Sequence, residues 1–222
     1  METKIPLTQS FGLIEVGPEG PLDARICLIG EAPGEVEERE RRPFVGGAGK
    51  VINGMLQEAG IKREECYITN VMRVRPPQNK FAAFYDVVKE GKRKRMAPSL
   101  ALQDGWQRLH DEIMSVRPNI TVAMGAEPLK ALAEGNLPIT KWRGSILHSS
   151  VGKVLAAYHP AAVMRQWDWR AGTVFDLEKA KAEAAYPEIR RRPRDVTICH
   201  TPEDAARAFV ALNDAQRISF DI

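Results

Sequence analysis

The stretch RICLIGEAPG, residues 25–34, joins a short apolar run directly to a tight polar turn. Residues 25–30 have the length and the apolar side chains of a buried strand, and the Pro and Gly of residues 31–34 end such a strand. Two further runs have a similar form, CYITN at residues 66–70 and NITVAM at residues 119–124. The chain therefore contains several short buried strands, each followed by a turn.

Longer segments with helical spacing separate these strands. Apolar residues recur every three or four positions in residues 50–60, 100–116 and 171–184, which we predict to be helices. Strands that alternate with helices predict a mostly parallel sheet that is covered on both faces. We therefore expect an α/β fold, a three-layer α-β-α sandwich with a central, mostly parallel four-stranded sheet, in which residues 145–149 and 153–157 form a hairpin.

Polar turns follow three of the predicted strands, at residues 31–34, 70–75 and 159–160. In a parallel sheet the carboxyl ends of the strands lie along one edge, and ligands bind beyond that edge. The sequence therefore predicts that the polar side chains of these three turns meet in one ligand site.

Composition places the chain among ordinary globular proteins. It has 222 residues, 44% of them hydrophobic and 27% charged, and its net charge of +3 permits a polyanionic partner without requiring one. No apolar run has the length of a membrane span and no leader precedes the first strand, so we expect a soluble, cytoplasmic protein without a membrane partner. Cys27, Cys66 and Cys199 show no C-x-x-C spacing, and we expect the first two to be buried thiols.

Four parts are expected along the chain. Residues 1–24 are rich in Gly and Pro and predict an arm over the surface, and residues 25–186 form the main domain. Residues 187–194 are a basic linker. Residues 195–222 have the pattern of a strand, a helix and a strand, which predicts a partial second domain or a short accessory β-α-β appendage. Residues 81–99, within the main domain, are expected to form a long basic loop.

Three groups of motifs, in this order, resemble the uracil-DNA glycosylase superfamily, and most closely its family 4 type. The residues that carry the resemblance are GEAPG at 30–34 with RPFVG at 42–46, YITN at 67–70 with RPPQN at 75–79, and YHPAA at 158–162. The resemblance implies a DNA repair enzyme that flips uracil out of DNA and hydrolyses the N-glycosidic bond to leave an abasic site. It implies a monofunctional glycosylase whose partner is uracil-containing DNA, single- or double-stranded.

The resemblance assigns roles that the chemistry of the residues supports. Glu31 would be the acidic catalytic residue that stabilises the cationic sugar, and His159 would stabilise the negative charge on the departing base. Phe44 offers a ring on which the base stacks, and Asn70 offers an amide that pairs with uracil and mismatches cytosine. The other residues expected to bind the substrate are Gly30, Ala32, Pro33 and Gly34.

Each of these side chains also has an ordinary structural explanation. Phe44 is then a core residue, Asn70 caps a turn, and His159 is a buried side chain bonded to a neighbour. The motifs around each residue favour the functional interpretation, because all three groups occur together and follow predicted strands.

The catalytic acid has alternatives within the same segment. Glu37 and Glu38 match a second acidic position of the family, so they compete with Glu31 for this role. Ala32 stands where some relatives carry a water-activating Asp. This departure favours catalysis through stabilisation of the leaving group over catalysis through a strong general base.

DNA contacts are expected from a glycine-rich segment, from the basic loop and from the turn after His159. The glycines allow a phosphate to approach the backbone closely, and the family carries an apolar wedge after its His-Pro turn. The structural alternatives are loop glycines, solvated charges and the buried face of a helix. The expected DNA-contact residues are Gly46, Gly49, Lys92, Arg93, Arg95, Val163, Met164 and Arg165.

The sequence departs from the family 4 type in its cysteines. Members of that type hold a 4Fe–4S cluster with four cysteines, whereas Val74 and a residue near Asp104 stand at two of those positions and the arm has no cysteine pair. We therefore expect no cofactor and no metal, with the arm and the helix at 100–116 held by packing alone. Residues 92–99 resemble the basic insertion of a relative that traps DNA through a histidine; Arg95 stands there, which predicts turnover without a permanent crosslink.

Residues 195–222 resemble the first strand, helix and strand of the 3′–5′ exonuclease domain of family A DNA polymerases, with Asp221 as its first metal-binding carboxylate. This implies linkage to a DNA polymerase, so an alternative function is a weakly catalytic uracil-sensing or DNA-tethering module of a polymerase. A hydrolase or nucleotide-binding protein would carry G-x-S-x-G, a P-loop or G-x-G-x-x-G, and none is present. We expect a monomer.

Overall fold

The computed structural model describes residues 14–90, 93–133, 135, 137–190 and 198–213. The chain divides into two compact units, residues 1–189 and residues 190–222, which are described separately. Among the described residues, no helix combines the length and the apolar composition that a membrane crossing requires.

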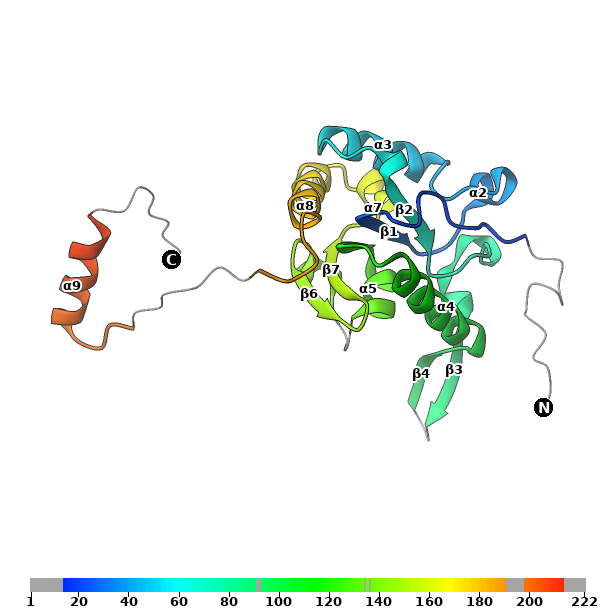
Figure 1. The fold of residues 1–222 in the computed structure, drawn as a ribbon. Helices are drawn as coiled ribbons and strands as arrows, with labels where there is room; N and C mark the ends of the chain where they lie inside the picture. Colours follow the sequence, from blue (N-terminus) through cyan, green and yellow to red (C-terminus); the bar gives the residue numbers. More distant parts are fainter. Residues whose placement is uncertain (1–13, 91–92, 134, 136, 191–197, 214–222) are drawn as a thin grey trace. The chain divides into compact units, whose positions relative to one another are not determined.

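A five-stranded sheet forms the centre of the first unit, in the order β2-β1-β5-β7-β6 (Figure 1). Its four parallel strands are β1 (Ile26–Gly30), β2 (Cys66–Asn70), β5 (Ile120–Met124) and β7 (Gly152–Ala157). The fifth strand, β6 (Ile146–Ser149), is antiparallel to β7 and lies at one edge of the sheet. The register pairs Gly30 with Asn70, so the carboxyl ends of β1 and β2 lie side by side.

The prediction of a three-layer α/β fold with a mostly parallel sheet is confirmed, and β6 and β7 form the predicted hairpin. The predicted number of strands is short by one, because the first arm of this hairpin extends the sheet as a fifth strand. Most of β6 is partly exposed, which suits a strand at the edge of a sheet.

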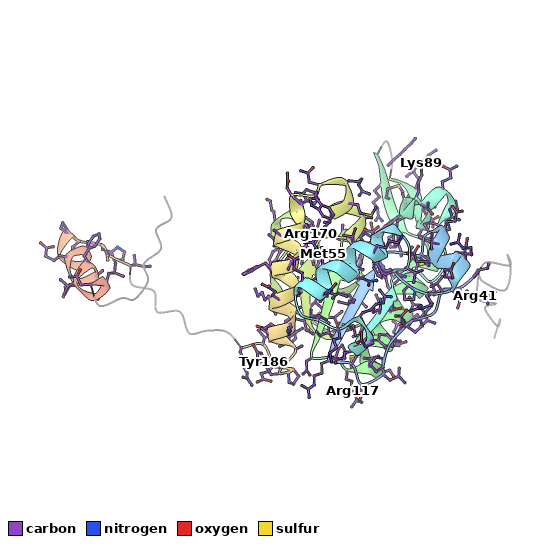
Figure 2. All side chains as sticks on the ribbon, turned by 90° about the horizontal axis from the view of Figure 1, so that it is seen from above. Arg41, Met55, Lys89, Arg117, Arg170 and Tyr186 are labelled. Atoms are coloured by element: carbon purple, nitrogen blue, oxygen red, sulfur yellow. The ribbon has the colours of Figure 1, made fainter. Side chains whose placement is uncertain are left out.

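Helices cover both faces of the sheet (Figure 1). The helices on one face are α3 (Gly47–Glu58), α7 (Pro160–Arg165) and α8 (Trp169–Glu183). The helices on the other face are α4 (Leu100–Val116) and α5 (Ala126–Leu132). The three long helices predicted from spacing correspond to α3, α4 and α8. Met55 of α3, labelled in Figure 2, is fully buried.

The side chains of β1 explain why this strand is apolar at every position. Ile26 and Leu28 belong to the core beneath α3 and α8, and Cys27 and Ile29 belong to the core beneath α4. Alternate residues of a strand point to opposite faces, so a central strand between two helical layers buries all of them. The predicted burial of the Cys27 and Cys66 thiols is confirmed.

The segment predicted as a long basic loop is an antiparallel hairpin, so that prediction is wrong. β3 (Tyr85–Glu90) pairs with β4 (Arg93–Pro98), and Val87 lies opposite Met96. The hairpin projects from the sandwich in Figure 1, and Figure 2 places its Lys89 at the edge of the unit. The strand signal is weak because both faces of a projecting hairpin meet solvent, which removes the usual alternation of apolar and polar residues.

Short elements connect these layers. They are α2 (Glu35–Glu40), η1 (Arg63–Glu65), η2 (Pro77–Asn79), η3 (Phe81–Phe84) and α6 (Ile139–Trp142). Four of them, α2, η2, η3 and α6, contribute residues to a cavity at the carboxyl edge of the sheet.

The described part of the N-terminal arm lies along β2. Val16 is buried, and Glu19 exchanges backbone hydrogen bonds with Ile68. The Glu19 carboxylate also forms ion pairs with Arg42 and Arg63. The expectation that packing alone holds the arm is therefore wrong, since hydrogen bonds and charges attach it as well.

The second unit contains α9 (Pro202–Leu212), which agrees with the helix predicted there. Thr201 accepts a hydrogen bond from the Asp204 amide, and the Asp204 carboxylate accepts one from the Thr201 amide, which forms a capping box. The predicted strands at 195–199 and 217–222, and Asp221 with them, lie wholly or mostly outside the described residues.

Candidate active site

A cavity of about 590 Å³ opens at the carboxyl edge of the sheet. It is lined by Glu31 directly after β1, by Asn70 at the end of β2 and by His159 shortly after β7. Phe44, from the loop before α3, lines the cavity too. The three polar turns thus converge on one edge, as the parallel direction of their strands predicted.

Gly30 makes the inner part of this cavity possible. A Cβ atom at Gly30 would lie 2.3 Å from Asn70 Oδ1 and 2.5 Å from Phe44 Cζ. Both side chains are buried, so the amide and the ring lie together against bare backbone. Within the described residues the Asn70 side chain forms no hydrogen bond, which leaves its donor and its acceptor for a ligand.

Charged side chains of α4 hold the end of β2 in place. Arg108 donates to the Asn70 carbonyl at 2.8 Å and forms an ion pair with Glu112. Glu112 also accepts a hydrogen bond from the Tyr67 hydroxyl at 2.8 Å and pairs with Arg73 at 3.0 Å. The expectation that packing alone holds α4 is therefore wrong, and this network fixes the backbone that carries the Asn70 amide.

Phe44 has a left-handed backbone conformation, with a φ of 51°, which bulky residues rarely adopt. Arg63 holds this turn by donating to the Pro43 carbonyl at 2.7 Å and to the Phe44 carbonyl at 3.2 Å. Gly49 packs so closely behind it that a Cβ atom there would lie 2.0 Å from the Phe44 carbonyl oxygen. Such a strained and heavily supported backbone is typical of a preorganised site.

His159 caps the N-terminus of α7, and its Nδ1 accepts a hydrogen bond from the Ala161 amide at 3.2 Å. In a neutral imidazole, an accepting Nδ1 places the proton on Nε2. Burial and the neighbouring Arg165 guanidinium lower the pKa of His159 to about 4, so the ring is neutral at pH 7. The ring centroids of His159 and Phe44 are 5.9 Å apart. The cavity therefore holds a neutral N–H donor beside an aromatic ring.

The Glu31 carboxylate forms no hydrogen bond within the described residues. Burial and the negative charge of Glu127 raise the pKa of Glu31 to about 7, and the positive charge of Arg165 opposes them. Gly125, with a φ of 107°, gives this carboxylate room, because a Cβ atom there would lie 2.9 Å from Glu31 Oε1 and 3.1 Å from His159 Cβ. Glu31 is therefore an acid that titrates near neutral pH.

The two alternative acids have partners inside the protein. Glu37 is buried, and its Oε1 accepts hydrogen bonds from the amides of Val45 at 3.1 Å and Gly46 at 2.7 Å. Glu38 forms an ion pair with Arg75 at 3.4 Å. Glu37 therefore shapes the loop that carries the aromatic ring, and Glu31 is the unpartnered member of the three predicted acids.

Comparison with known proteins agrees with this arrangement. The sequence profile described as the Uracil DNA glycosylase superfamily matches residues 18–186. The chain belongs to the uracil-DNA glycosylase superfamily. It is 36% identical over 184 residues to a type-4 uracil-DNA glycosylase of Thermotoga maritima, a match covering 81% of this chain and 88% of that protein. It is 33% identical over 164 residues to a type-4 uracil-DNA glycosylase of Archaeoglobus fulgidus, covering 70% and 75% of the two proteins.

A different kind of relative extends further along the chain. A DNA polymerase of Bacillus phage SP01 is 26% identical over 211 residues, which cover 92% of this chain and 21% of the polymerase. The glycosylase superfamily match ends at residue 186. Because the polymerase match takes in 92% of the chain, it continues into the second unit.

Within this superfamily member, three residues predicted to contact DNA serve the protein interior. Val163 is fully buried in the core, because it lies on the inner face of α7. The Gly46 amide already donates to Glu37, and Gly49 is buried against the Phe44 backbone. In this structure these three residues contact the protein's own core and backbone, since a glycine that permits close approach can serve the protein's own backbone as well as a phosphate.

The other predicted DNA-contact residues are exposed or lie outside the described residues. Met164 is 49% exposed, and Arg165 is exposed and lines the cavity. Arg95 is exposed on β4. Lys92 and the side chain of Arg93 are outside the part of the chain that the structure describes. Arg165 thus lines the cavity, and Met164 lies beside it, since a Cβ atom at the cavity-lining Gly47 would lie 3.2 Å from Met164 Cε.

Three aromatic residues of the cavity wall, Phe81, Tyr158 and Trp169, were not predicted. Ala32, Pro33 and Gly34 line the cavity as expected, but Tyr158 and Trp169 line it too, with stacked rings whose centroids are 4.2 Å apart. Tyr158 directly precedes the His-Pro motif, so its position in the sequence could have identified it. Trp169 opens α8, and no local pattern marks it as part of the site.

The iron–sulfur cluster of the family 4 type does not fit this chain. The chain has three cysteines, one fewer than such a cluster needs as ligands. Cys27 and Cys66 belong to opposite cores, and Val74 packs against the core of α4. Among the described residues, no group of three or more His, Cys, Asp or Glu could hold a metal ion. No step of the chemistry is assigned to a metal.

Proposed function

We propose that the chain is a monofunctional uracil-DNA glycosylase of DNA repair, which flips uracil out of DNA and hydrolyses its N-glycosidic bond to leave an abasic site. The observation that carries this proposal is the single cavity in which Glu31, Asn70 and His159 surround a space beside the Phe44 ring. The type-4 uracil-DNA glycosylases that match most of the chain support it.

The flipped base stacks on Phe44 and pairs with Asn70. Stacking of a base on an aromatic ring contributes roughly 1–3 kcal/mol. The Asn70 Nδ2 donates to uracil O4 while its Oδ1 accepts from uracil N3–H. Cytosine presents the opposite pattern and would leave the buried amide unpaired, which discriminates strongly against it.

His159 stabilises the leaving group. As the bond from the sugar to uracil N1 breaks, its electron pair moves onto the base and negative charge accumulates at O2. A neutral Nε2–H can donate a hydrogen bond to that oxygen and keep its proton, so it stabilises the negative charge without fully protonating the base. The pKa of about 4, caused by burial and by Arg165, keeps His159 in this neutral form across the working pH range.

Glu31 acts on the sugar and on water. Its negative charge stabilises the oxocarbenium-like sugar, and its carboxylate orients a water molecule toward C1′. The water oxygen forms the new bond to C1′, the C1′–N1 bond breaks, and Glu31 accepts the water proton. The uracil anion takes a proton from solvent after it leaves. Ala32 provides no second carboxylate for this step.

A DNA strand approaches along the mouth of the cavity. Arg165 lines the cavity and Met164 lies exposed beside the cavity-lining Gly47, which offers a cation that can pair with a phosphate and an apolar side chain that can replace the extracted base. The projecting β3–β4 hairpin adds exposed basic residues, Lys89 and Lys94 among them. The chain would act as a monomer, within the cytoplasm.

Excision of uracil from labelled oligonucleotides, followed by alkaline cleavage, tests the proposal. Asn70→Ala and His159→Ala should each slow excision by about 10²–10³, as expected for loss of one preorganised donor. His148→Ala, an exposed histidine on β6, is the matched control and should excise at the wild-type rate. Near-wild-type excision by both cavity variants, with unchanged melting temperatures in all three, would refute these roles.

The polymerase relative favours a second candidate function. Its match extends into the second unit, which is consistent with a weakly catalytic module that senses uracil or tethers DNA for a polymerase. The same oligonucleotide assay separates the two functions. Strands that stay tightly bound and intact after alkali support the tether, and cleaved strands support the enzyme.

A further inference from the structure

The proposed chemistry makes no use of the turn at residues 75–79, RPPQN, although this turn reaches the cavity. Pro76 and Asn79 both line the cavity, and Pro76 is buried whereas Asn79 is exposed. Among the described residues, the exposed polar side chains that line the cavity are Asn79 in η2, Thr140 in α6 and Arg165 in α7. These side chains therefore mark the rim at which the cavity opens.

The backbone of the turn has a conformation that few residues adopt. Gln78 and Asn79 have φ values of 54° and 58°, so two consecutive residues other than glycine are left-handed. Asparagine tolerates this conformation better than most residues, but it still costs free energy. The Asn79 backbone amide donates to the Pro76 carbonyl at 3.0 Å and closes the turn. The turn therefore fixes the position from which the Asn79 side chain extends.

Arg75 fixes the orientation of the Asn79 side-chain amide. Its Nε donates to Asn79 Oδ1 at 2.8 Å, and a guanidinium has only donors, so the amide oxygen must face it. The Nδ2 group of the same amide keeps two hydrogens that form no hydrogen bond within the described residues. Glu38 and Glu35 pair with the other nitrogens of Arg75, at 3.4 Å and 3.3 Å. Arg75 is thus engaged by the protein, and the Asn79 amide is a neutral donor with a fixed direction.

Asn79 and Arg165 belong to different sides of the rim. Val74 and Phe81, which flank the turn, pack against the core beneath α4, whereas α7 covers the opposite face of the sheet. A nucleotide drawn into the cavity stays joined to its strand by one phosphate on its 5′ side and another on its 3′ side. Arg165 can pair with one of them, and the Asn79 amide offers a donor for the other. Hydrogen bonds to phosphate oxygens come from asparagine side chains as well as from cations.

The charges around the turn are balanced. Glu35 and Glu38 bring two negative charges, and Arg75 and Lys80 bring two positive ones. A phosphate at this side of the rim is therefore neither strongly attracted nor strongly repelled by net charge. Its binding there depends on hydrogen bonds, which contribute more when the acceptor is charged.

We propose that Asn79 binds the substrate by donating its side-chain amide hydrogens to a phosphate next to the flipped uridine, on the side of the rim away from Arg165. The proposal rests on the proposed glycosylase function, which brings a uridine into the cavity. A fixed donor at this phosphate holds the nucleotide in place, so it strengthens binding without taking part in bond cleavage. The strained turn thus serves substrate binding.

Fluorescence anisotropy with labelled oligonucleotides tests this contact. The oligonucleotides carry one 2′-fluorinated deoxyuridine, because the fluorine destabilises the cationic sugar and prevents cleavage during the measurement. Asn79→Gly should weaken binding by about tenfold, the loss expected for a hydrogen bond to a charged group. Glycine adopts a positive φ without strain, so the turn should be kept. Gln78→Gly is the matched control, because Gln78 is exposed and left-handed but does not line the cavity, and it should bind as tightly as wild type.

A neutral methylphosphonate in place of one phosphate identifies the partner of Asn79. It is placed on the 5′ side or on the 3′ side of the uridine. At one of these two sites it should weaken binding to wild type by about fivefold and binding to Asn79→Gly by less than about twofold. Asn79→Asp keeps an acceptor for Arg75 but replaces the donors with a negative charge. This variant should bind more weakly than Asn79→Gly and should regain affinity on the same methylphosphonate.

Two results would overturn the proposal. One is wild-type affinity in Asn79→Gly, and the other is a loss in that variant that adds fully to the loss from each methylphosphonate. A lower melting temperature in Asn79→Gly leaves the test intact, because the methylphosphonate comparison is made within that one variant.

Single-turnover excision from unmodified uracil-containing DNA tests the function separately. The maximal rate constant of Asn79→Gly should lie within about threefold of the wild-type value, because the residue acts on binding. A larger fall in this rate constant would contradict a role in binding alone. A chain that shows the methylphosphonate pattern but excises no uracil refutes the glycosylase function and keeps the phosphate contact.

Discussion

Glu112 on α4 and Glu31 after β1 are two carboxylates with little access to water, and their surroundings are opposite. The Glu112 side chain is 8% exposed and takes hydrogen bonds or ion pairs from Tyr67, Arg73 and Arg108. Glu31 has no hydrogen-bond donor within the described residues, and its pKa is raised to about 7 by burial and a neighbouring acid.

This difference separates a structural use of charge from a functional one. A buried carboxylate with several donors belongs to the fold, because its removal leaves those donors unpaired. A carboxylate without donors costs stability when it is ionised, but its lone pairs stay free for water or substrate. The partnered acid therefore predicts a folding defect on mutation, and the unpartnered acid predicts a catalytic one.

Glu112→Ala should cause the largest loss of stability, about 3–5 kcal/mol, because it leaves two guanidinium groups and a hydroxyl without their partner. Urea denaturation measures this loss as a lower midpoint. Glu65→Ala is the control, since it breaks an exposed ion pair with Lys62 and should cost less than about 1 kcal/mol. Equal losses in the two variants would show that the partnered Glu112 carboxylate stabilises the fold no more than an exposed ion pair does.

Glu31→Gln should have the opposite effect on stability and should slow excision. The folded-state pKa of about 7 lies above the ordinary value of 4.5, so ionisation of Glu31 destabilises the fold as the pH rises from 4.5 through 7. The variant should therefore be more stable than wild type at pH 8, by up to about 3 kcal/mol, and equally stable at pH 4. Thermal melts at the two pH values measure this, and a gain at pH 4 as large as that at pH 8 would contradict the assigned cause.

Gly125→Ala should disturb both the backbone and the acid. Its φ of 107° strains any other residue, and the added Cβ would lie 2.9 Å from Glu31 Oε1, so we expect a loss of about 1–3 kcal/mol and slower excision. Gly152→Ala is a matched control, with a φ of 101° and nothing within 4 Å of its Cβ. It should lose stability without slower excision, and a catalytic defect in both variants would assign the effect to strain alone.

Met164→Ala should have the smallest effect, a loss of about 1 kcal/mol, or roughly fivefold, in the affinity for uracil-containing DNA. Met114→Ala is the control, because this methionine is similarly exposed, at 45% against 49%, but lies on α4 beside the structural acid. Fluorescence anisotropy with labelled oligonucleotides compares them. Equal affinities in both variants would show that the cavity mouth does not engage DNA through this side chain.

Sequence patterns located the central strands and the long helices because their burial leaves a local signal. β1 is apolar at every position since it is covered on both faces, and α4 repeats its buried residues at helical spacing. The β3–β4 hairpin left no such signal, because its basic strands project from the sandwich. The fifth strand was missed for a related reason, since local pattern does not tell whether the arm of a hairpin joins a sheet.

The candidate site was predictable only in part. Glu31, Asn70 and His159 each follow a predicted strand, so topology alone brings them to one edge. The residues on either side of Gly125 do not distinguish it from other glycines that end a strand. In the sequence, Glu127 is one of many acids that stand in the first turn of a helix. Their importance depends on the position of the Glu31 carboxylate, which belongs to another part of the chain.

The sequence by itself determined an α/β sandwich and the edge at which its polar turns meet, because apolar burial and chain direction leave their mark on neighbouring residues. Only the tertiary structure decided that Glu31 stays unpartnered while Glu37 and Glu38 are engaged. It also decided that Gly46 and Gly49 support the aromatic loop. Hydrogen-bond donors and neighbouring charges come from residues far apart in the chain, so no local pattern reveals which acid is left free to react.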